Sequence, residues 1–172
     1  MGLHRLILMR HAKSSWDDAS LRDHDRPLSK RGYRSCRLIG KQLREAAILP
    51  EEAVISSALR CLETWQGLKS SARLSIAHRV EPDLYHAGIT QMLGILRSSR
   101  KPVVLMLGHN PGTAVFASMI LRESNRAATH SQFGRYPTAA TAVIDFDIDS
   151  WSDLVPATGE LIDFWIPREL EA

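Results

Sequence analysis

The sequence is poor in cysteine, with only Cys36 and Cys61 among its 172 residues. Two cysteines cannot form the disulfide framework of a small secreted domain, so a reducing compartment suits the chain best. Long hydrophobic runs are also missing. The apolar stretch near the start ends at Arg10, too early for a signal peptide, and no run approaches the length of a membrane span. We therefore expect a cytoplasmic protein with no membrane partner.

The chain has no strong excess of charge of either sign. Lysine and arginine number 22 against 19 aspartates and glutamates, which gives a formal net charge of +3 without a dense basic block. No nucleic-acid partner is expected, whereas an anionic substrate is compatible with this balance. Hydrophobic residues make up 44% of the chain and charged residues 24%, as in ordinary globular proteins. The length suits a single domain over residues 1–172.

Several catalytic and metal-binding patterns are absent. A cysteine phosphatase needs an arginine six residues after its cysteine, but Gln42 and Gly67 stand at those positions after Cys36 and Cys61. No phosphate-binding Walker loop or dinucleotide fingerprint occurs. The seven histidines show neither His-x-His nor His-Glu-x-x-His spacing, so no zinc site is predicted. We expect neither a metal ion nor a cofactor.

Apolar periodicity predicts alternating strands and helices in the first two-thirds of the chain. Strands are expected over residues 3–9, 53–57, 75–80, 102–107, 142–148 and 161–166. Helices are expected after Ser29, after Arg60, over residues 90–98 and over residues 112–121, and residues 123–135 are expected to form a polar loop. This alternation predicts a three-layer α/β/α sandwich with a mostly parallel central sheet. The last two strands could pair as a hairpin.

Two of the predicted helices carry more specific expectations. Ser29 is placed to cap the first, whose apolar face is predicted to run from Cys36 to Ala47. The helix over residues 112–121 is nearly all apolar, which predicts that it is buried. Gly112 at its start would allow this helix to begin close to a ligand.

Polar side chains follow three of the predicted strands. Arg10 and His11 end the first strand, Arg60 follows the second, and His109 follows the strand over residues 102–107. Open α/β sheets bind ligands at the carboxyl ends of their strands. Two arginines could clamp a phosphoryl group, while one imidazole attacks phosphorus and the other stabilises charge. Each residue alone is better explained as a loop or surface residue, but their joint placement favours a functional site.

The same residues lie within motifs that resemble a known family. The motifs are LMRHAKS at 8–14, DRPLSKRG at 25–32, SSALRCLET at 56–64, LGHNP at 107–111 and YPTAA at 136–140. Together they resemble the histidine phosphatase superfamily, with its phosphoglycerate mutase-like fold, and most closely its small phosphohistidine phosphatase branch of the SixA type. The resemblance covers essentially the whole chain in the right order.

The resemblance implies a role for each of the four residues. His11 would be the phosphate-accepting nucleophile, Arg10 and Arg60 would bind the phosphoryl group, and His109 would bind it and stabilise its charge. The implied activity is metal-independent hydrolysis of a phosphohistidine or a phosphomonoester through a covalent phosphohistidine intermediate on His11. The implied substrate is a phosphorylated protein, possibly one that bears phosphohistidine, or a small phosphoester.

The sequence departs from the family pattern at two positions and leaves the general acid open. Ala12 stands where the first motif usually has glycine. Asp17 stands where mutase-like members have a phosphate-contacting asparagine, and a carboxylate so close to phosphate would be repulsive, which disfavours mutase chemistry. Either Asp17 points away from the phosphate, or it is protonated, or the pocket differs from that of the mutases. Glu81 and Asp83 are possible general acids, although an interpretation of both as surface charges of a loop is at least as good.

A second class of function remains open at this stage. The domain could be a non-catalytic adaptor or sensor on the same fold that binds phosphate in the pocket. The presence of both arginines and both histidines disfavours this alternative, because binding alone does not need a nucleophilic histidine beside the phosphate.

Overall fold

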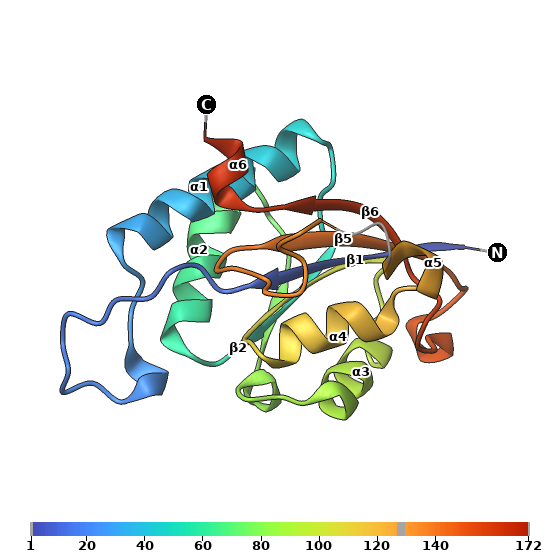
Figure 1. Cartoon of the computed structure of the whole chain (residues 1–172), viewed down its shortest axis with the longest axis horizontal. Coiled ribbons are helices and arrows are strands. Elements are labelled where there is room, and N and C mark those ends of the chain that lie inside the picture. The colour runs from blue at the N-terminus through green and yellow to red at the C-terminus, as the bar shows by residue number, and fades with distance from the viewer. Residues whose placement is uncertain (1, 127–129, 172) are drawn as a thin grey trace.

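Six strands form one sheet, and their order in the sheet differs from their order in the sequence. The computed structural model describes residues 2–126 and 130–171 and gives the order β3-β2-β4-β1-β5-β6. The strands are β1 (Leu3–Arg10), β2 (Glu52–Ser56), β3 (His78–Glu81), β4 (Val103–Gly108), β5 (Thr141–Asp147) and β6 (Glu160–Trp165). The first four are parallel, β5 is antiparallel to β1, and β6 is antiparallel to β5. The predicted mostly parallel sheet and the terminal hairpin are confirmed (Figure 1).

Helices cover both faces of the sheet. On one side lie α1 (Lys30–Glu45), α2 (Leu59–Ala72) and the short α6 (Pro167–Leu170), and on the other lie α3 (Ile89–Arg97) and α4 (Gly112–Ile120) (Figure 1). This arrangement confirms the predicted three-layer α/β/α sandwich. No helix in the described part of the chain is both long enough and apolar enough to cross a membrane.

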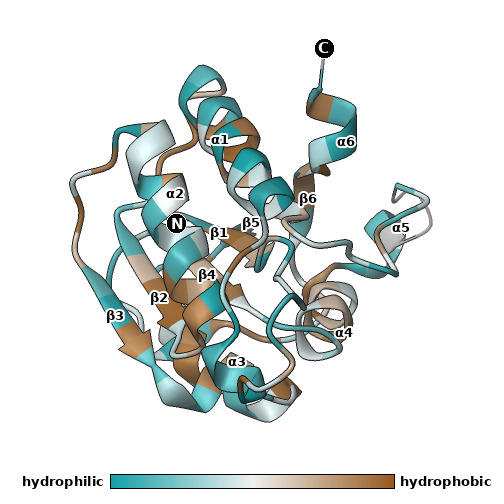
Figure 2. Ribbon diagram, turned by 90° about the vertical axis from the view of Figure 1, so that its left-hand side faces the viewer, coloured by the Kyte–Doolittle hydropathy of each residue, from teal (hydrophilic) through white to brown (hydrophobic). Residues whose placement is uncertain are grey.

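The core consists of two apolar clusters, one on each face of the sheet. In β1, Leu6 and Leu8 belong to the cluster beneath α3 and α4, whereas Ile7 and Met9 belong to the cluster beneath α1 and α2. All four are fully buried, and each contributes about 1.5–3 kcal/mol to stability by leaving water. Figure 2 shows the hydrophobic residues of the strands between the helical layers. This two-sided burial fixes β1, and therefore the residues that follow it.

Four expectations about individual elements need correction. The first helix ends at Glu45, and Ala47 lies outside it, exposed and with a φ of 55°, so the apolar face stops earlier than predicted. The third strand begins at His78, later than predicted. Helix α4 is buried on one face only, because Val115 is 47% exposed. The expected polar loop contains the short helix α5 (Glu123–Arg126), and residues 127–129 of that loop lie outside the described residues.

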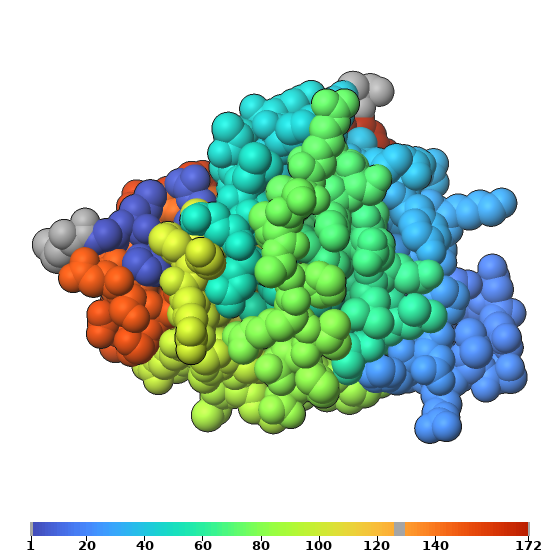
Figure 3. Space-filling model, turned by 180° about the vertical axis from the view of Figure 1, so that it is seen from behind, coloured from blue at the N-terminus to red at the C-terminus, as the bar shows by residue number. Residues whose placement is uncertain are grey.

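The loop between β1 and α1 forms one end of the molecule (Figures 1 and 3). It contains a single turn of 3-10 helix, Asp23–Asp25. As predicted, the hydroxyl of Ser29 caps α1 by accepting a hydrogen bond from the backbone N–H of Gly32. A side chain at Gly32 would meet the carbonyl oxygen of Lys13 at 2.2 Å, so only glycine lets α1 pack this closely on the segment after β1.

Candidate active site

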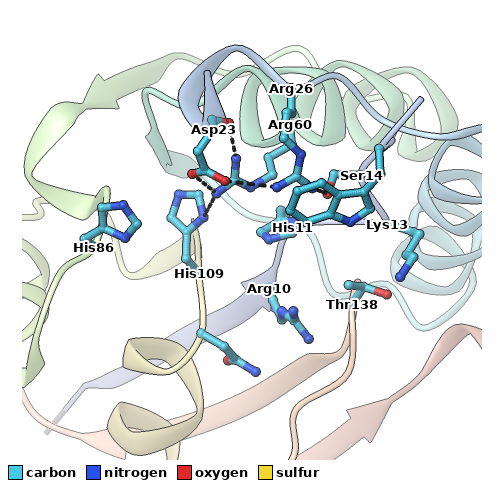
Figure 4. Close-up of a pocket in the computed structure, with 12 residues that line it drawn as sticks. Arg10, His11, Lys13, Ser14, Asp23, Arg26, Arg60, His86, His109 and Thr138 are labelled. Carbon is cyan, nitrogen blue, oxygen red and sulfur yellow. Dashed lines mark hydrogen bonds and ion pairs between the residues drawn. The ribbon is translucent and has the colours of Figure 1, made fainter. Parts of the chain in front are cut away.

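One pocket brings together the four residues at the strand ends. Arg10, His11, Arg60 and His109 line a cavity of about 290 Å³ at the carboxyl edge of the sheet (Figure 4). The other lining residues are Lys13, Ser14, Trp16, Asp23, Arg26, His86, Asn110 and Thr138.

Strand pairing explains this convergence. β1 and β4 pair in parallel, with Arg10 opposite Gly108, and the backbone N–H of His11 donates to the carbonyl of Gly108 at 3.0 Å. His11 and His109 therefore leave neighbouring strands at the same level. β2 pairs with the other side of β4, and Arg60 opens the helix that follows β2.

His11 is held in one tautomer by its own loop. Its Nδ1 lies 2.7 Å from the carbonyl oxygen of Ala12, and a carbonyl can only accept, so Nδ1 carries the proton and Nε2 keeps its lone pair. Burial, together with the charges of Arg60, Arg10 and Arg26, lowers the pKa of His11 to about 4, although the bond to Ala12 opposes the shift. At neutral pH the ring is therefore uncharged, and Nε2 is available as a nucleophile.

His109 has the opposite tautomer. Its Nδ1 lies 3.4 Å from a guanidinium nitrogen of Arg60, which can only donate, so Nε2 carries the proton and donates to the hydroxyl of Ser56 at 2.7 Å. Burial, together with His11, Arg60 and His86, lowers the pKa of His109 to about 3, although the charge of Asp23 opposes the shift. The rings of His11 and His109 lie 5.3 Å apart. Both rings are thus neutral, and both line the same cavity.

Asp23 holds the arginines of the pocket in place. Arg60 donates to its backbone oxygen at 2.7 Å and to its carboxylate at 3.0 Å, and Arg26 donates to the same carboxylate at 2.9 Å. The hydroxyl of Tyr85 donates to it at 2.5 Å. The Tyr85 bond and the two guanidinium groups hold the pKa of Asp23 far below its usual range, although partial burial opposes them. Asp23 is therefore a carboxylate that orients Arg60 and Arg26.

Arg26 is a third arginine in the pocket, buried and fixed on several sides. It donates to the backbone oxygen of Ser15 at 3.2 Å and to the hydroxyl of Ser14. Its guanidinium also stacks on the indole of Trp16, 3.3 Å from the ring centroid, a cation–π contact that leaves one side of this exposed tryptophan open to solvent. The motif at 25–32 contained Arg26, but sequence reasoning gave it no role.

Two residues of the motif at 56–64 form hydrogen bonds with the segment between β1 and α1. The hydroxyl of Thr64 accepts from the backbone N–H of Ala12 at 3.0 Å and donates to the carbonyl of Arg60 at 2.6 Å. The carboxylate of Glu63 accepts from the backbone N–H of Leu28 and from the hydroxyl of Tyr33, each at 2.8 Å. These bonds fix the spacing between the His11 loop and the start of α2.

The structure does not bring every candidate into the pocket. Glu81 and Asp83 are not among its lining residues, because the carboxylate of Glu81 caps the turn Pro82–Leu84 by accepting from the backbone N–H of Asp83. Asp17 is exposed and also lies outside the pocket lining, so it does not introduce the expected repulsion.

Close packing at the start of α4 requires glycine at position 112. A side chain there would meet the carbonyl oxygen of Ala87 at 2.3 Å. The missing side chain therefore lets the segment before α3 pack against α4. That packing places the preceding residue, His86, at the wall of the pocket.

The two depressed histidine pKa values predict an acid-sensitive fold. Because His11 and His109 have folded-state pKa values below the unfolded value of about 6.5, the unfolded chain binds protons first as the pH falls. Stability present above pH 6.5 is therefore lost toward pH 4, by about 1.4 kcal/mol per pH unit for each histidine. Urea unfolding at pH 7 and pH 5 should show a loss that is about 2 kcal/mol smaller for His109→Gln than for the wild type.

The exposed His78 lies outside the pocket and provides the control for this measurement. His78→Gln should lose as much stability as the wild type between the two pH values. Equal losses in the wild type and in His109→Gln would show that His109 is not buried in its neutral form.

Comparison with known proteins identifies relatives of the chain. The family model for the histidine phosphatase superfamily (branch 1) matches residues 6–95. An uncharacterized protein of Mycobacterium tuberculosis is 30% identical over 164 residues, which cover 93% of this chain and 100% of that protein. An uncharacterized chloroplastic protein of Arabidopsis thaliana is 34% identical over 136 residues, or 73% of this chain, and the match spans 62% of that protein's length.

Solved structures share the fold over nearly the full length. A protein of Nakamurella multipartita named as a phosphohistidine phosphatase SixA has a TM-score of 0.80 at 30% identity, covering 97% of this chain and 98% of its own. One of the same name from Agrobacterium tumefaciens has a TM-score of 0.81 at 25% identity, with 95% and 98% coverage. The protein histidine phosphatase SixA complexed with tungstate has a TM-score of 0.78 at 21% identity, with 97% and 99% coverage, and at that identity supports the fold alone.

Proposed function

The chain belongs to the histidine phosphatase superfamily and is a phosphatase, and from that premise we propose that it hydrolyses phosphohistidine, or a related phosphomonoester, through a covalent phosphohistidine on His11. The observation that carries the proposal is the state of His11. Its Nδ1 proton is bound by the Ala12 carbonyl, and its neutral ring lies in a pocket lined by three arginines. A neutral imidazole among fixed cations suits attack on a phosphoryl group and is ill suited to passive binding, which needs no nucleophile.

The reaction has two steps. In the first, the Nε2 lone pair of His11 forms a bond to phosphorus, and the bond from phosphorus to the leaving atom breaks with its electron pair on that atom. In the second, water attacks phospho-His11, the P–N bond breaks, and its electron pair returns to Nε2 as inorganic phosphate leaves. The bond from Nδ1 to Ala12 is kept throughout, so the same tautomer is restored after each turnover.

The charges of the pocket stabilise the transferring group. Arg10, Arg26 and Arg60 bind the phosphoryl oxygens, and Asp23 fixes two of these guanidinium groups before the substrate arrives. Donors already in position require no reorganisation during the reaction. His109 takes up a proton as the phosphoryl anion enters, because a nearby negative charge favours the imidazolium. Its Nδ1 then donates to a phosphoryl oxygen while Ser56 keeps hold of Nε2.

The rim of the pocket supports a protein-borne phosphoryl group. Trp16 is 71% exposed and lines the pocket beside the exposed Lys13. Both lie on the loop that forms one end of the molecule, where a second protein can approach. The names of the structural relatives agree with this class of substrate, and phosphohistidine is therefore the substrate that we propose first.

A substrate panel tests this function. Phosphohistidine peptides, phosphoserine peptides and p-nitrophenyl phosphate should all be compared by kcat/KM, and the phosphohistidine peptides should be the best substrates. Mixing and quenching should trap a label on His11 that is labile in acid and stable in alkali. Tight binding of the peptides without turnover would instead support the adaptor or sensor function.

Activity should survive an excess of chelator. Three guanidinium groups and an imidazolium supply the charge stabilisation that a divalent ion supplies in other phosphatases. Within residues 2–126 and 130–171, no group of three or more His, Cys, Asp or Glu side chains is placed to hold a metal ion. The test is kcat/KM for p-nitrophenyl phosphate with and without EDTA, and a loss that Mg²⁺ or Mn²⁺ restores would contradict metal-independent hydrolysis.

A further inference from the structure

The two-step reaction requires a proton on the leaving atom, and most side chains of the pocket cannot supply it. Asp23 is a carboxylate bound by two arginines and a tyrosine. Once the phosphoryl anion has entered, His109 donates its Nε2 proton to Ser56 and its Nδ1 proton to a phosphoryl oxygen, so neither proton reaches the leaving atom. Glu81 and Asp83 lie outside the pocket lining. A proton donor must therefore be sought elsewhere on the wall.

A second cavity adjoins the phosphate pocket. It has a volume of about 300 Å³, and His86, His109 and Asn110 line both cavities. The rest of its wall is mainly apolar and consists of Ala87, Gly88, Ile89, Pro111, Gly112 and Val115. A substrate whose phosphoryl group occupies the first cavity and whose remainder occupies the second has its scissile bond beside the three shared residues.

Of these three residues, only His86 is free to donate a proton. The amide of Asn110 donates to the backbone oxygens of Arg135 and Tyr136 at 2.9 and 3.1 Å and carries no transferable proton. The two ring protons of the His109 imidazolium are used by Ser56 and by a phosphoryl oxygen. The ring of His86 is exposed, so it can exchange protons with solvent, and it lies on the far side of His109 from His11 (Figure 4). Its centroid is 6.4 Å from that of His109.

The backbone of His86 adopts an uncommon conformation that places the ring at the pocket wall. His86 has a φ of 60°, a left-handed conformation that histidine adopts only occasionally. Its ring contacts that of Tyr85 at a tilt of 42°, with the ring centroids 4.0 Å apart, and Tyr85 is anchored by its bond to Asp23. The close approach of Ala87 to Gly112 fixes the other side of the segment. Strain of this kind persists where the surroundings determine the geometry, and it is common at functional sites.

We propose that His86 is the general acid that protonates the leaving atom, and that the adjoining apolar cavity receives the leaving group. The inference rests on the proposed nucleophilic role of His11. In the first step the His86 imidazolium gives its proton to the leaving atom as the bond to phosphorus breaks. In the second step the neutral His86 ring takes a proton from the attacking water, which restores the imidazolium.

Two substrates with different leaving groups test the role of His86. His86→Asn removes the proton donor and keeps a residue that tolerates a positive φ. p-Nitrophenolate departs without a proton, so this variant should phosphorylate His11 from p-nitrophenyl phosphate within about threefold of the wild-type rate. Benzyl phosphate needs protonation of a poor leaving group, and its reaction should slow by roughly 10²–10⁴-fold. The variant should also accumulate phospho-His11, because activation of water is impaired.

The outcomes separate this inference from the function on which it rests. His78→Asn, which changes an exposed histidine outside both cavities, should match the wild type with either substrate. Equal losses of His86→Asn in the rate of His11 phosphorylation by the two substrates, or no loss in either rate, would overturn the role of His86 while leaving His11 as the nucleophile. Absence of any label on His11 in the wild type would overturn the proposed function and the role of His86 with it.

The leaving-group cavity has its own test at Val115. This side chain is 47% exposed on α4 and lines only the second cavity, so Val115→Asp should leave the fold and the phosphate pocket intact. The ratio of kcat/KM for benzyl phosphate to that for ethyl phosphate should fall by about tenfold, because a carboxylate disfavours an apolar ring beside it. An unchanged ratio would show that the leaving group does not occupy this cavity.

Discussion

His11→Ala is expected to abolish turnover and to remove the acid-labile label from the quenched enzyme. The only nucleophile that the proposed reaction uses is Nε2 of this ring, whose direction is fixed by the bond from Nδ1 to the Ala12 carbonyl. Loss of a covalent nucleophile leaves only the binding contribution of the arginines. The expected fall in kcat is therefore on the order of 10⁴-fold or more. Quenched-flow labelling and steady-state assays on one preparation measure both effects.

The fold should tolerate this change, so a loss of activity can be assigned to chemistry. The imidazole of His11 bonds only to its neighbour's backbone, whereas its backbone N–H holds β1 to β4 whatever the side chain is. Circular dichroism and thermal unfolding should confirm a folded protein. His78→Ala should keep both activity and label. A His11→Ala protein that hydrolyses phosphoesters at the wild-type rate would leave the family relationship as a statement about fold alone.

The four residues at the strand ends could be found from sequence because they depend on local order and on a general property of parallel sheets. Each follows an apolar run that can only be a buried strand, and the carboxyl ends of such strands meet at one edge. β4 lies between β2 and β1, an order that the sequence does not specify. Even so, any parallel arrangement of these three strands would have brought Arg10, Arg60 and His109 to the same edge.

The remaining residues of the pocket depend on tertiary contacts that no local pattern encodes. Asp23 and Arg26 lie in a long polar loop, and their positions follow from bonds to Arg60 and from the stacking on Trp16. Ser56 belongs to the motif at 56–64, but the motif alone does not indicate its role. That role is a hydrogen bond to His109, which links the end of β2 to the end of β4.

The general acid shows how one turn can mislead reasoning from sequence. Glu81 and Asp83 have the right chemistry and lie in the right region of the chain. The short turn Pro82–Leu84 takes them away from the pocket, and the positive φ of His86 brings an imidazole to the wall instead. Such a conformation depends on Asp23, which anchors the neighbouring Tyr85, and on Gly112, which packs against Ala87, and these contacts come from elsewhere in the fold, so no local pattern could indicate it.

Arg60→Ala should lower kcat/KM by about 10²–10³-fold, which corresponds to about 3–4 kcal/mol of transition-state stabilisation. Arg60 is buried, and Asp23 already fixes its guanidinium through a backbone oxygen and a carboxylate. The guanidinium is therefore preorganised, and no free energy is lost in ordering it during the reaction. Arg60→Lys should lie between the wild type and Arg60→Ala, since lysine keeps the charge but loses the planar fork that matches two phosphoryl oxygens. Assays with p-nitrophenyl phosphate measure all three proteins.

The label distinguishes a lost phosphate contact from a lost fold. Arg60→Ala should still become phosphorylated at His11, only more slowly, because the nucleophile is oriented by Ala12 and does not touch Arg60 through any bond. Arg44→Ala is the matched control, since Arg44 donates from α1 to the carbonyl of Ser71 and does not line the pocket. It removes a half-buried arginine that holds two helices together. Equal losses of kcat/KM in the two variants would mean that Arg60 acts by supporting the fold. A label on a residue other than His11 would mean that Arg60 positions the phosphoryl group differently from the proposed reaction.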